Sequence, residues 1–168
     1  MKRWLWSIAI AFVALVVVLV VIYVSLFSGR SEGTRIGTVS TTFRFIGPND
    51  TVALSRFDDD AVDGVSCFLA RARTGGIGGA VGTAEDPSRL SLSCIATGVV
   101  KPRNNAKFSE LSGRNVFSER ASVLFKTVDV HRFFDAERNA LCYVAISTKL
   151  IEGSPANATA CINVATAK

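Results

Sequence analysis

A glycine-rich segment that follows two arginines is the pattern in this sequence with the clearest capacity for chemistry. Five glycines fall within positions 75–82. Consecutive backbone N–H groups without bulky side chains can surround an anion, and guanidinium groups pair with phosphate or carboxylate oxygens. The segment lacks the phosphate-binding motifs of nucleotide-binding proteins, and glycine also serves wherever a strand connection needs a positive φ angle. We predict a site for a small anionic ligand formed by Arg71, Arg73, Gly75, Gly76, Gly78 and Gly79.

Two other groups of polar residues offer weaker signals. His131 would share a strand face with Asp129, but the sequence has no Gly-x-Ser-x-Gly elbow to supply a nucleophile. The acidic run 58–60, with Asp63, lacks the ligand spacing of an EF-hand. We interpret it as a solvated turn, with an irregular calcium site as the alternative. A single histidine excludes a multi-histidine metal centre, so we predict no catalytic residues, no metal and no cofactor.

The first 27 residues have the composition of a membrane-spanning helix. Trp4–Phe27 has no charged residue, no glycine and no proline in 24 positions. A helix of that length extends about 36 Å, against about 30 Å for the hydrocarbon core of a bilayer. A cleaved signal peptide is the alternative, although its apolar core would be about 7–15 residues long. We predict a membrane anchor over 1–27, a tether over 28–35 and a folded domain over 36–168.

The four cysteines indicate where the domain folds. They include no Cys-x-x-Cys pair, which argues against a zinc ribbon or a thioredoxin-type motif. An even number behind a membrane-targeting segment indicates disulfides in an oxidising compartment, and four buried thiols in a cytosolic domain are the alternative. Of the three possible connectivities we favour Cys67–Cys94 and Cys142–Cys161, with the first pair on two neighbouring strand-like runs.

Alternating apolar and polar residues predict strands through most of the domain. Val39, Thr41, Phe43 and Phe45 alternate with polar or charged residues, which predicts a strand whose apolar face is buried. Turn residues follow at 47–50. Further strands are expected over 51–57, 65–73, 90–97, 121–134, 139–149 and 160–165, and a short helix is compatible with 101–113. The predicted fold is mainly β, a single antiparallel sandwich or partly open barrel domain preceded by one N-terminal transmembrane helix.

The charges are few and scattered. The net charge is +5, and no long run of one sign occurs, which excludes a basic tail that binds nucleic acid and an acidic disordered tail. Arg132, Asp135, Glu137 and Arg138 surround the connector between the strands expected over 121–134 and 139–149. We predict that they form a solvated rim, with a partner-binding surface as the alternative.

Several stretches occur in an order that resembles one bacterial protein family. They include FIGPND at 45–50, ARTGGI at 72–77, RFFDA at 132–136 and EGSP at 152–155. Over about residues 36–158 the chain resembles the CreA family, extracytoplasmic bacterial proteins of unknown function. The resemblance implies a periplasmic protein of one domain, and it supports pairing Cys67 with Cys94, which match cysteines of the family pattern. It supplies no catalytic residues. The long apolar segment departs from the family's ordinary signal peptide, and Cys142 and Cys161 are additions to the pattern.

Together, these observations predict a membrane-anchored periplasmic domain that binds a partner and catalyses no reaction. The expected partners are the inner membrane, through the N-terminal helix, and an envelope protein or a small anionic ligand. Nucleic acid is not expected, and the oligomeric state is not predicted. If the segment is cleaved, the domain is released into the periplasm. The alternative is an envelope enzyme or redox-active protein that uses the glycine-rich segment, His131 or a labile disulfide.

Overall fold

The apolar N-terminal stretch and the remaining chain form separate units in the computed structural model, Met1–Arg30 and Ser31–Lys168. In the first unit, residues 12–18 and 20–21 are helical. No helix among the described residues is long and apolar enough to cross a membrane. The transmembrane helix predicted within the first 27 residues is therefore not confirmed. The residues that the structure describes are 12–18, 20–21, 33–80, 89–120, 127–148 and 155–164.

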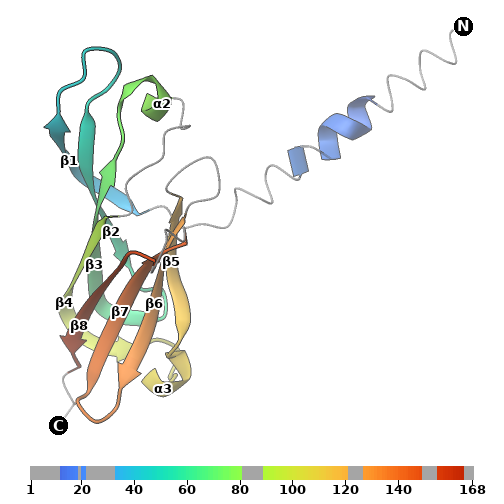
Figure 1. Ribbon diagram of the computed structural model, residues 1–168. Coiled ribbons are helices and arrows are strands. Elements are labelled where there is room, and N and C mark those ends of the chain that lie inside the picture. The colour runs from blue at the N-terminus through green and yellow to red at the C-terminus, as the bar shows by residue number, and fades with distance from the viewer. Residues whose placement is uncertain are drawn as a thin grey trace, which may run out of the picture. The chain divides into compact units, whose positions relative to one another are not determined.

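The second unit contains two four-stranded antiparallel sheets (Figure 1). The strands of the first sheet follow the order of the chain: β1 (Thr34–Thr42), β2 (Asp50–Asp58), β3 (Val62–Arg73) and β4 (Leu90–Pro102). So do those of the second: β5 (Arg114–Arg120), β6 (Thr127–Asp135), β7 (Ala140–Ser147) and β8 (Asn157–Asn163). Two short helices connect strands, α2 (Gly76–Ala80) and α3 (Phe108–Leu111). The prediction of a mainly β, antiparallel fold is confirmed as two sheets.

The core lies between the two sheets and follows from the alternation along each strand. On β3 every second residue faces inward, and on β7 the buried residues again alternate with half-buried ones. The rings of Phe57 on β2 and Phe117 on β5 stack with centroids 4.3 Å apart and join the sheets on one side. On the other side β4 lies beside β8 (Figure 1). The largest apolar side chains of the core are Phe57, Leu69, Phe117, Leu141, Tyr143 and Ile162.

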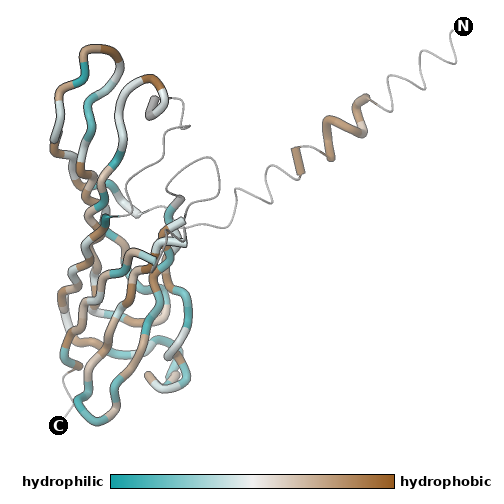
Figure 2. The backbone as a smooth tube through the Cα atoms, viewed as in Figure 1, coloured by the Kyte–Doolittle hydropathy of each residue, from teal (hydrophilic) through white to brown (hydrophobic). Residues whose placement is uncertain are grey.

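One strand prediction is wrong about its buried face. The strand β1 ends at Thr42, and all nine of its residues are exposed, so the second sheet covers neither of its faces. Phe43 and Phe45 lie beyond it in the β1–β2 loop and are 79% and 94% exposed. The loop and α2 form one end of the second unit, far from the β6–β7 turn (Figures 1 and 2). Alternation alone therefore identified the strand but not whether a second sheet covers it.

The region between β4 and β6 holds one predicted and one unpredicted element. The short helix expected within 101–113 is α3, and the ring of Phe108 stacks on Phe134 with centroids 5.0 Å apart. The sequence does not predict the strand β5, because its only two apolar residues, Val116 and Phe117, are adjacent to each other and show no alternation. Pairing with β6 makes it a strand. Residues 121–126, which were predicted to begin the β6 strand, lie outside the described residues.

Candidate functional site

The two arginines of the predicted anion site lie at the end of β3, on the face that turns toward the second sheet. Nη2 of Arg71 and Nη2 of Arg73 both donate to Oε1 of Glu119 on β5, at 2.9 and 2.7 Å. The hydroxyl of Ser55 also donates to Glu119, at 3.4 Å. The Arg71 and Glu119 side chains are buried, and Arg73 is one-third exposed. The arginines therefore already pair with a carboxylate of the protein, and the anion site stays a prediction.

The glycines that follow them hold α2 against the β1–β2 loop. The Gly75 N–H donates to Oδ1 of Asp50 at 2.7 Å, and the Gly76 N–H donates to the carbonyl oxygen of Pro48 at 2.6 Å. Gly47 has a φ of +86°, and a Cβ at that position would lie 2.6 Å from the carbonyl carbon of Gly76. Close approach of two backbones thus explains Gly47 and Gly75, and a φ of +75° explains Gly76. Gly78 and Gly79, the remaining predicted ligands, are part of α2.

An ion pair completes the connection between the loop and α2. Nε and Nη2 of Arg44 donate to the two carboxylate oxygens of Asp50, at 2.8 and 3.0 Å. The Arg44 N–H donates to Oδ1 of Asn49 at 2.9 Å. Hydrogen bonds from the Arg44 side chain, and then from the Gly75 N–H, lower the pKa of the Asp50 carboxyl. We call this set of contacts the clamp: Arg44, Pro48, Asn49 and Asp50 in the loop, with Gly75 just before α2 and Gly76 at its start.

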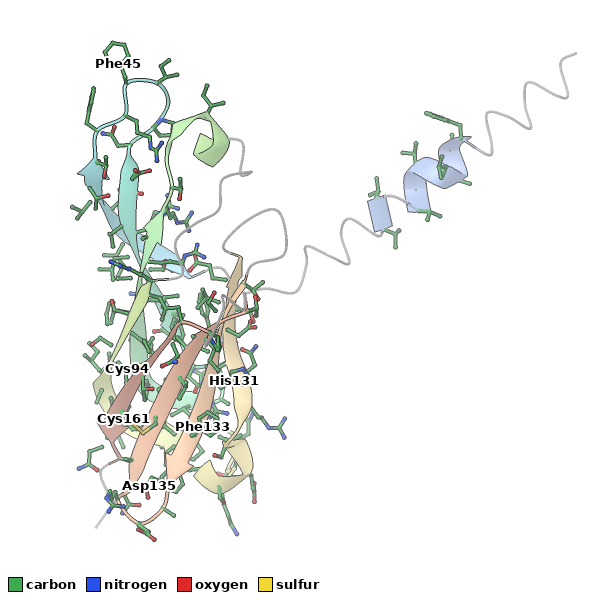
Figure 3. The ribbon with its side chains drawn as sticks, viewed as in Figure 1. Phe45, Cys94, His131, Phe133, Asp135 and Cys161 are labelled. Atoms are coloured by element: carbon green, nitrogen blue, oxygen red, sulfur yellow. A yellow bond between two sulfur atoms is a disulfide. The ribbon has the colours of Figure 1, made fainter. Side chains whose placement is uncertain are left out.

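The clamp supports four large apolar side chains that face solvent. Phe43, Phe45 and Ile46 come from the loop, and Ile77 comes from α2, with exposed fractions between 65% and 94%. Figure 3 shows Phe45 at the far end of the second unit from Asp135. We call these four residues the apolar tip. Exposed apolar residues that are gathered on a rigid support mark a contact surface more often than scattered ones do.

A second polar cluster, formed around Asp59 and Arg132, is buried in the core. Arg132 donates to both carboxylate oxygens of Asp59, and the hydroxyl of Tyr143 donates to Asp59 at 2.9 Å. Arg132 also donates twice to the carbonyl oxygen of Leu111. Burial raises the pKa of the Tyr143 hydroxyl, and the charge of Asp59 raises it further. Arg132 and a tyrosine that keeps its proton serve here as structural groups, and the partners of both lie within the fold.

This cluster corrects two predictions from the sequence. Asp59 is 3% exposed, so the acidic run is not a solvated turn throughout; Asp58 instead faces outward and accepts a hydrogen bond from Ser66. Arg132 is 1% exposed and does not belong to a solvated rim, whereas Arg138 and Glu137 are exposed as expected. The alternation of the β6 sequence places Arg132 on the same face as the buried Val130, a signal that could have identified it.

His131 and Asp129, the residues considered for catalysis, are not hydrogen-bonded to each other in the structure. Asp129 accepts a hydrogen bond from the Ser118 hydroxyl at 2.6 Å, on the outer face of the second sheet. His131 lies opposite Asn115 and Val144 in the strand register. Within the described residues no hydrogen bond links His131 to Asp129 or to a hydroxyl. The geometry therefore gives no nucleophile and base in contact.

A small cleft lies near the start of β1. The stacked rings of Phe57 and Phe117 are part of its lining, and Arg56, Asp58 and Asp60 line it as well. Its volume is about 200 Å³. Pockets that enclose drug-sized ligands measure roughly 300–1,000 Å³, so this cleft is smaller than an ordinary ligand site. It contains none of the residues predicted to bind a ligand.

Both predicted disulfides are present. Cys67–Cys94 and Cys142–Cys161 each join residues that lie directly opposite on neighbouring strands. Cys67 is buried in the core, whereas Cys161 is exposed on the outer face of the second sheet (Figure 3). Phe133 lies opposite Cys142 in the register and is 44% exposed. Two disulfides indicate an oxidising, extracytoplasmic compartment.

Comparison with known proteins decides the family. Residues 36–167 match the family described as CreA protein. The chain belongs to the CreA family. It is 44% identical over 134 residues to Protein CreA of Escherichia coli strain K12, and equally to those of strains O6:H1 and O157:H7. The match covers 80% of this chain and 85% of each relative. No solved structure matches the chain.

The family resemblance bears directly on the apolar tip. Two of the stretches that carry it, 45–50 and 72–77, are separated along the chain but are joined by the clamp. The family match therefore includes the loop, the start of α2 and their connection. Sequence reasoning identified both stretches but expected Phe43 and Phe45 to be buried, and it expected the glycines to face a ligand. It had no signal that the two stretches would meet.

Proposed function

We propose that this CreA family member is a non-catalytic binding protein of the bacterial envelope. Its N-terminal segment holds it at the inner membrane, its domain faces the periplasm, and it contacts its partner through the apolar tip. The observation that carries the proposal is the tip itself. Phe45 is 94% exposed on a loop that is fixed by an ion pair and by two hydrogen bonds from backbone N–H groups. A protein gains no stability from such exposure, so we infer a partner that covers it.

The composition of the chain supports the location. The uncharged segment Trp4–Phe27 is long enough for a membrane-spanning helix. The two disulfides support a domain on the oxidising side of that membrane. A direct check is the intact mass of the protein taken from its native membrane and alkylated without reduction. We expect the full-length mass and no alkylation; loss of about 28 residues would instead indicate a released protein.

Site-specific photo-crosslinking tests the binding role. A benzophenone amino acid at position 45 should give a crosslinked product in intact cells. The benzophenone amino acid at position 136, which is exposed in the β6–β7 turn, should give no crosslinked product. Phe43→Ser combined with Ile46→Ser should lower the yield at position 45 several-fold. Val99→Ser is a matched control, because Val99 is 72% exposed on β4. Equal products at both positions, or none at position 45, would overturn the proposal.

A second candidate function is thiol–disulfide exchange, which the exposure of Cys161 favours. A thiolate of a partner can attack only a sulfur that it can reach, and the Cys67–Cys94 disulfide has one of its residues in the core. Replacing Cys142 with serine leaves the exposed Cys161 as a free thiol, whose thiolate can attack a partner's disulfide, forming a mixed disulfide and releasing one thiolate of the partner. If the protein exchanges disulfides, this variant should accumulate a mixed disulfide with a partner in cells; a monomeric protein with a free thiol would exclude the exchange.

A further inference from the structure

We propose that the partner of the apolar tip is the lipid bilayer, and that the tip inserts into the membrane surface. This inference rests on the proposed function, because it names the partner of the same surface. Three features of the molecule support a lipid partner over a protein one: the area of the tip, the pairing of its polar groups and the length of chain that precedes β1.

The apolar area of the tip is small for a protein interface. A fully exposed phenylalanine offers roughly 200 Å², and isoleucine somewhat less. With exposed fractions of 79%, 94%, 68% and 65%, Phe43, Phe45, Ile46 and Ile77 together offer roughly 570 Å². A standard protein interface buries about 800 Å² on each partner and needs a complementary shape. A lipid surface needs no complementary shape, and a narrow end of a molecule can enter it.

The charged groups and several N–H groups behind the tip pair with one another. In residues 43–50 and 75–80 the only charged side chains are Arg44 and Asp50, which form a two-bond ion pair. The N–H groups of Arg44, Gly75 and Gly76 donate to acceptors within the clamp. Polar groups that enter a bilayer must find partners inside the protein, since no water is available there. The clamp meets this condition for Arg44, Asp50 and the two glycine N–H groups, and it leaves the tip without net charge.

The chain before β1 is short enough to keep the tip near the membrane. Six residues, 28–33, separate the apolar segment from Thr34, where β1 begins. Fully extended, six residues reach about 20 Å. The nine residues of β1 reach about 30 Å toward the loop. In a domain anchored by residues 4–27, the start of β1 therefore lies within about 20 Å of the membrane, whereas the tip lies about 30 Å from the start of β1. Because the second distance is larger than the first, the domain can tilt until its tip reaches the membrane surface. Tethering of this kind also raises the effective concentration of a weakly binding surface.

A fluorophore at the tip tests the inference in the full-length protein. All four native cysteines are in disulfides, so Phe45→Cys introduces a single thiol for an environment-sensitive nitrobenzoxadiazole label. Ala136→Cys, labelled in the same way, is the control, because position 136 is exposed and directly follows Asp135 at the opposite end (Figure 3). Both proteins are reconstituted into phosphatidylcholine vesicles. We expect a several-fold rise in emission at position 45, at least half of it quenched by spin-labelled phosphatidylcholine, and no change at position 136.

Variants and salt distinguish insertion from other contacts. Adding Phe43→Asp and Ile77→Asp to the labelled protein should return the emission to its value in water, whereas Val99→Asp should leave it unchanged. Raising sodium chloride from about 0.1 to 0.5 M should have no effect, because the charges of Arg44 and Asp50 cancel. A signal that is lost in salt would overturn insertion of the apolar tip in favour of electrostatic contact with lipid headgroups.

The vesicle and crosslinking results together distinguish a failure of the lipid inference from a failure of the proposed function. If the label at position 45 reports water in vesicles and its benzophenone counterpart crosslinks to a protein in cells, the lipid inference is wrong and the binding role remains. If position 45 neither enters lipid nor crosslinks, both are wrong. A protein that fails to float with the vesicles would overturn the anchor as well as the insertion of the tip.

Discussion

Replacing Asp59 with alanine should destabilise the protein far more than the same change at its neighbour Asp58. The Arg132 and Asp59 side chains are each 2% exposed, and the variant leaves the guanidinium buried without its carboxylate. Removing one partner of a buried ion pair costs about 3–5 kcal/mol. Arg132 keeps its two hydrogen bonds to Leu111, which places the value toward the lower end, but Tyr143 also loses its acceptor. We expect a loss of about 4 kcal/mol, a large part of the 5–15 kcal/mol of a typical domain.

Urea unfolding at equilibrium, followed by circular dichroism, measures this loss. With a slope of about 2 kcal/mol per molar urea, the midpoint should fall by about 2 M. Asp58→Ala should shift it by less than about 0.5 M, because Asp58 is exposed and accepts only the Ser66 hydroxyl. Equal shifts for the two variants would refute the structural role of the cluster.

A double variant identifies the cause of the loss. Replacing Asp59 with leucine and Arg132 with methionine removes both charges, and such apolar replacements of a buried pair are often neutral or stabilising. The double variant should therefore be more stable than Asp59→Ala. If it is less stable than either single variant, the hydrogen bonds of the cluster, rather than an unpaired charge, determine the effect.

Three further predictions test the surface disulfide and the clamp. A mild reductant followed by alkylation should modify Cys142 and Cys161, while the Cys67–Cys94 disulfide and the circular dichroism spectrum stay unchanged. Modification of Cys67 and Cys94 first would contradict the burial pattern. The lowered pKa of Asp50 means that the clamp contributes stability above the unfolded pKa and loses it as the pH falls through the lower folded value. Hydrogen exchange of the α2 amides should therefore accelerate below about pH 4, and Asp50→Asn should show fast exchange with little pH dependence beyond that of the amide chemistry. Gly47→Ala should lower the free energy of unfolding, measured in urea, by about 1–3 kcal/mol, because residue 47 has a positive φ and an added Cβ would meet the backbone of α2. Gly37→Ala is the control, because a Cβ added at that position would have open space around it.

The fold could be predicted from sequence where the apolar pattern is distinct over a whole strand. Apolar residues recur at every second position of the segment that became β3, the segment that became β7 is a continuous apolar run, and the polar connector at 135–138 marks the β6–β7 hairpin. The strand β5 could not be predicted, since its two adjacent apolar residues show no period and its pairing with β6 determines its structure. Strand pairing is a non-local property, which a single sequence specifies only weakly.

The same limit explains what could be predicted of the polar clusters. Arg132 occupies an inward position of a correctly identified strand, so its burial could be inferred from register. Its partner Asp59 is 73 residues earlier in the chain, in the middle of an acidic run, where nothing distinguishes it from its neighbours. The pairing of Glu119 with the two arginines of β3 likewise depends on how the sheets pack. Chemistry-bearing residues could be found from sequence, but their partners could not.

The apolar tip is the point where the local pattern and the fold disagree most clearly. An alternating run that ends in Phe43 and Phe45 favours a half-buried strand, yet the chain leaves the strand at Thr42 and exposes both rings. The clamp fixes this arrangement, because Asp50 binds both Arg44 before it and the Gly75 amide from the next hairpin. A loop that exposed its aromatic residues through looseness would need no such contacts. Conflicts of this kind are expected at functional sites, where local rules give way to a contact with something outside the fold. The exposed rings are therefore better explained as one side of an interface than as an error of packing.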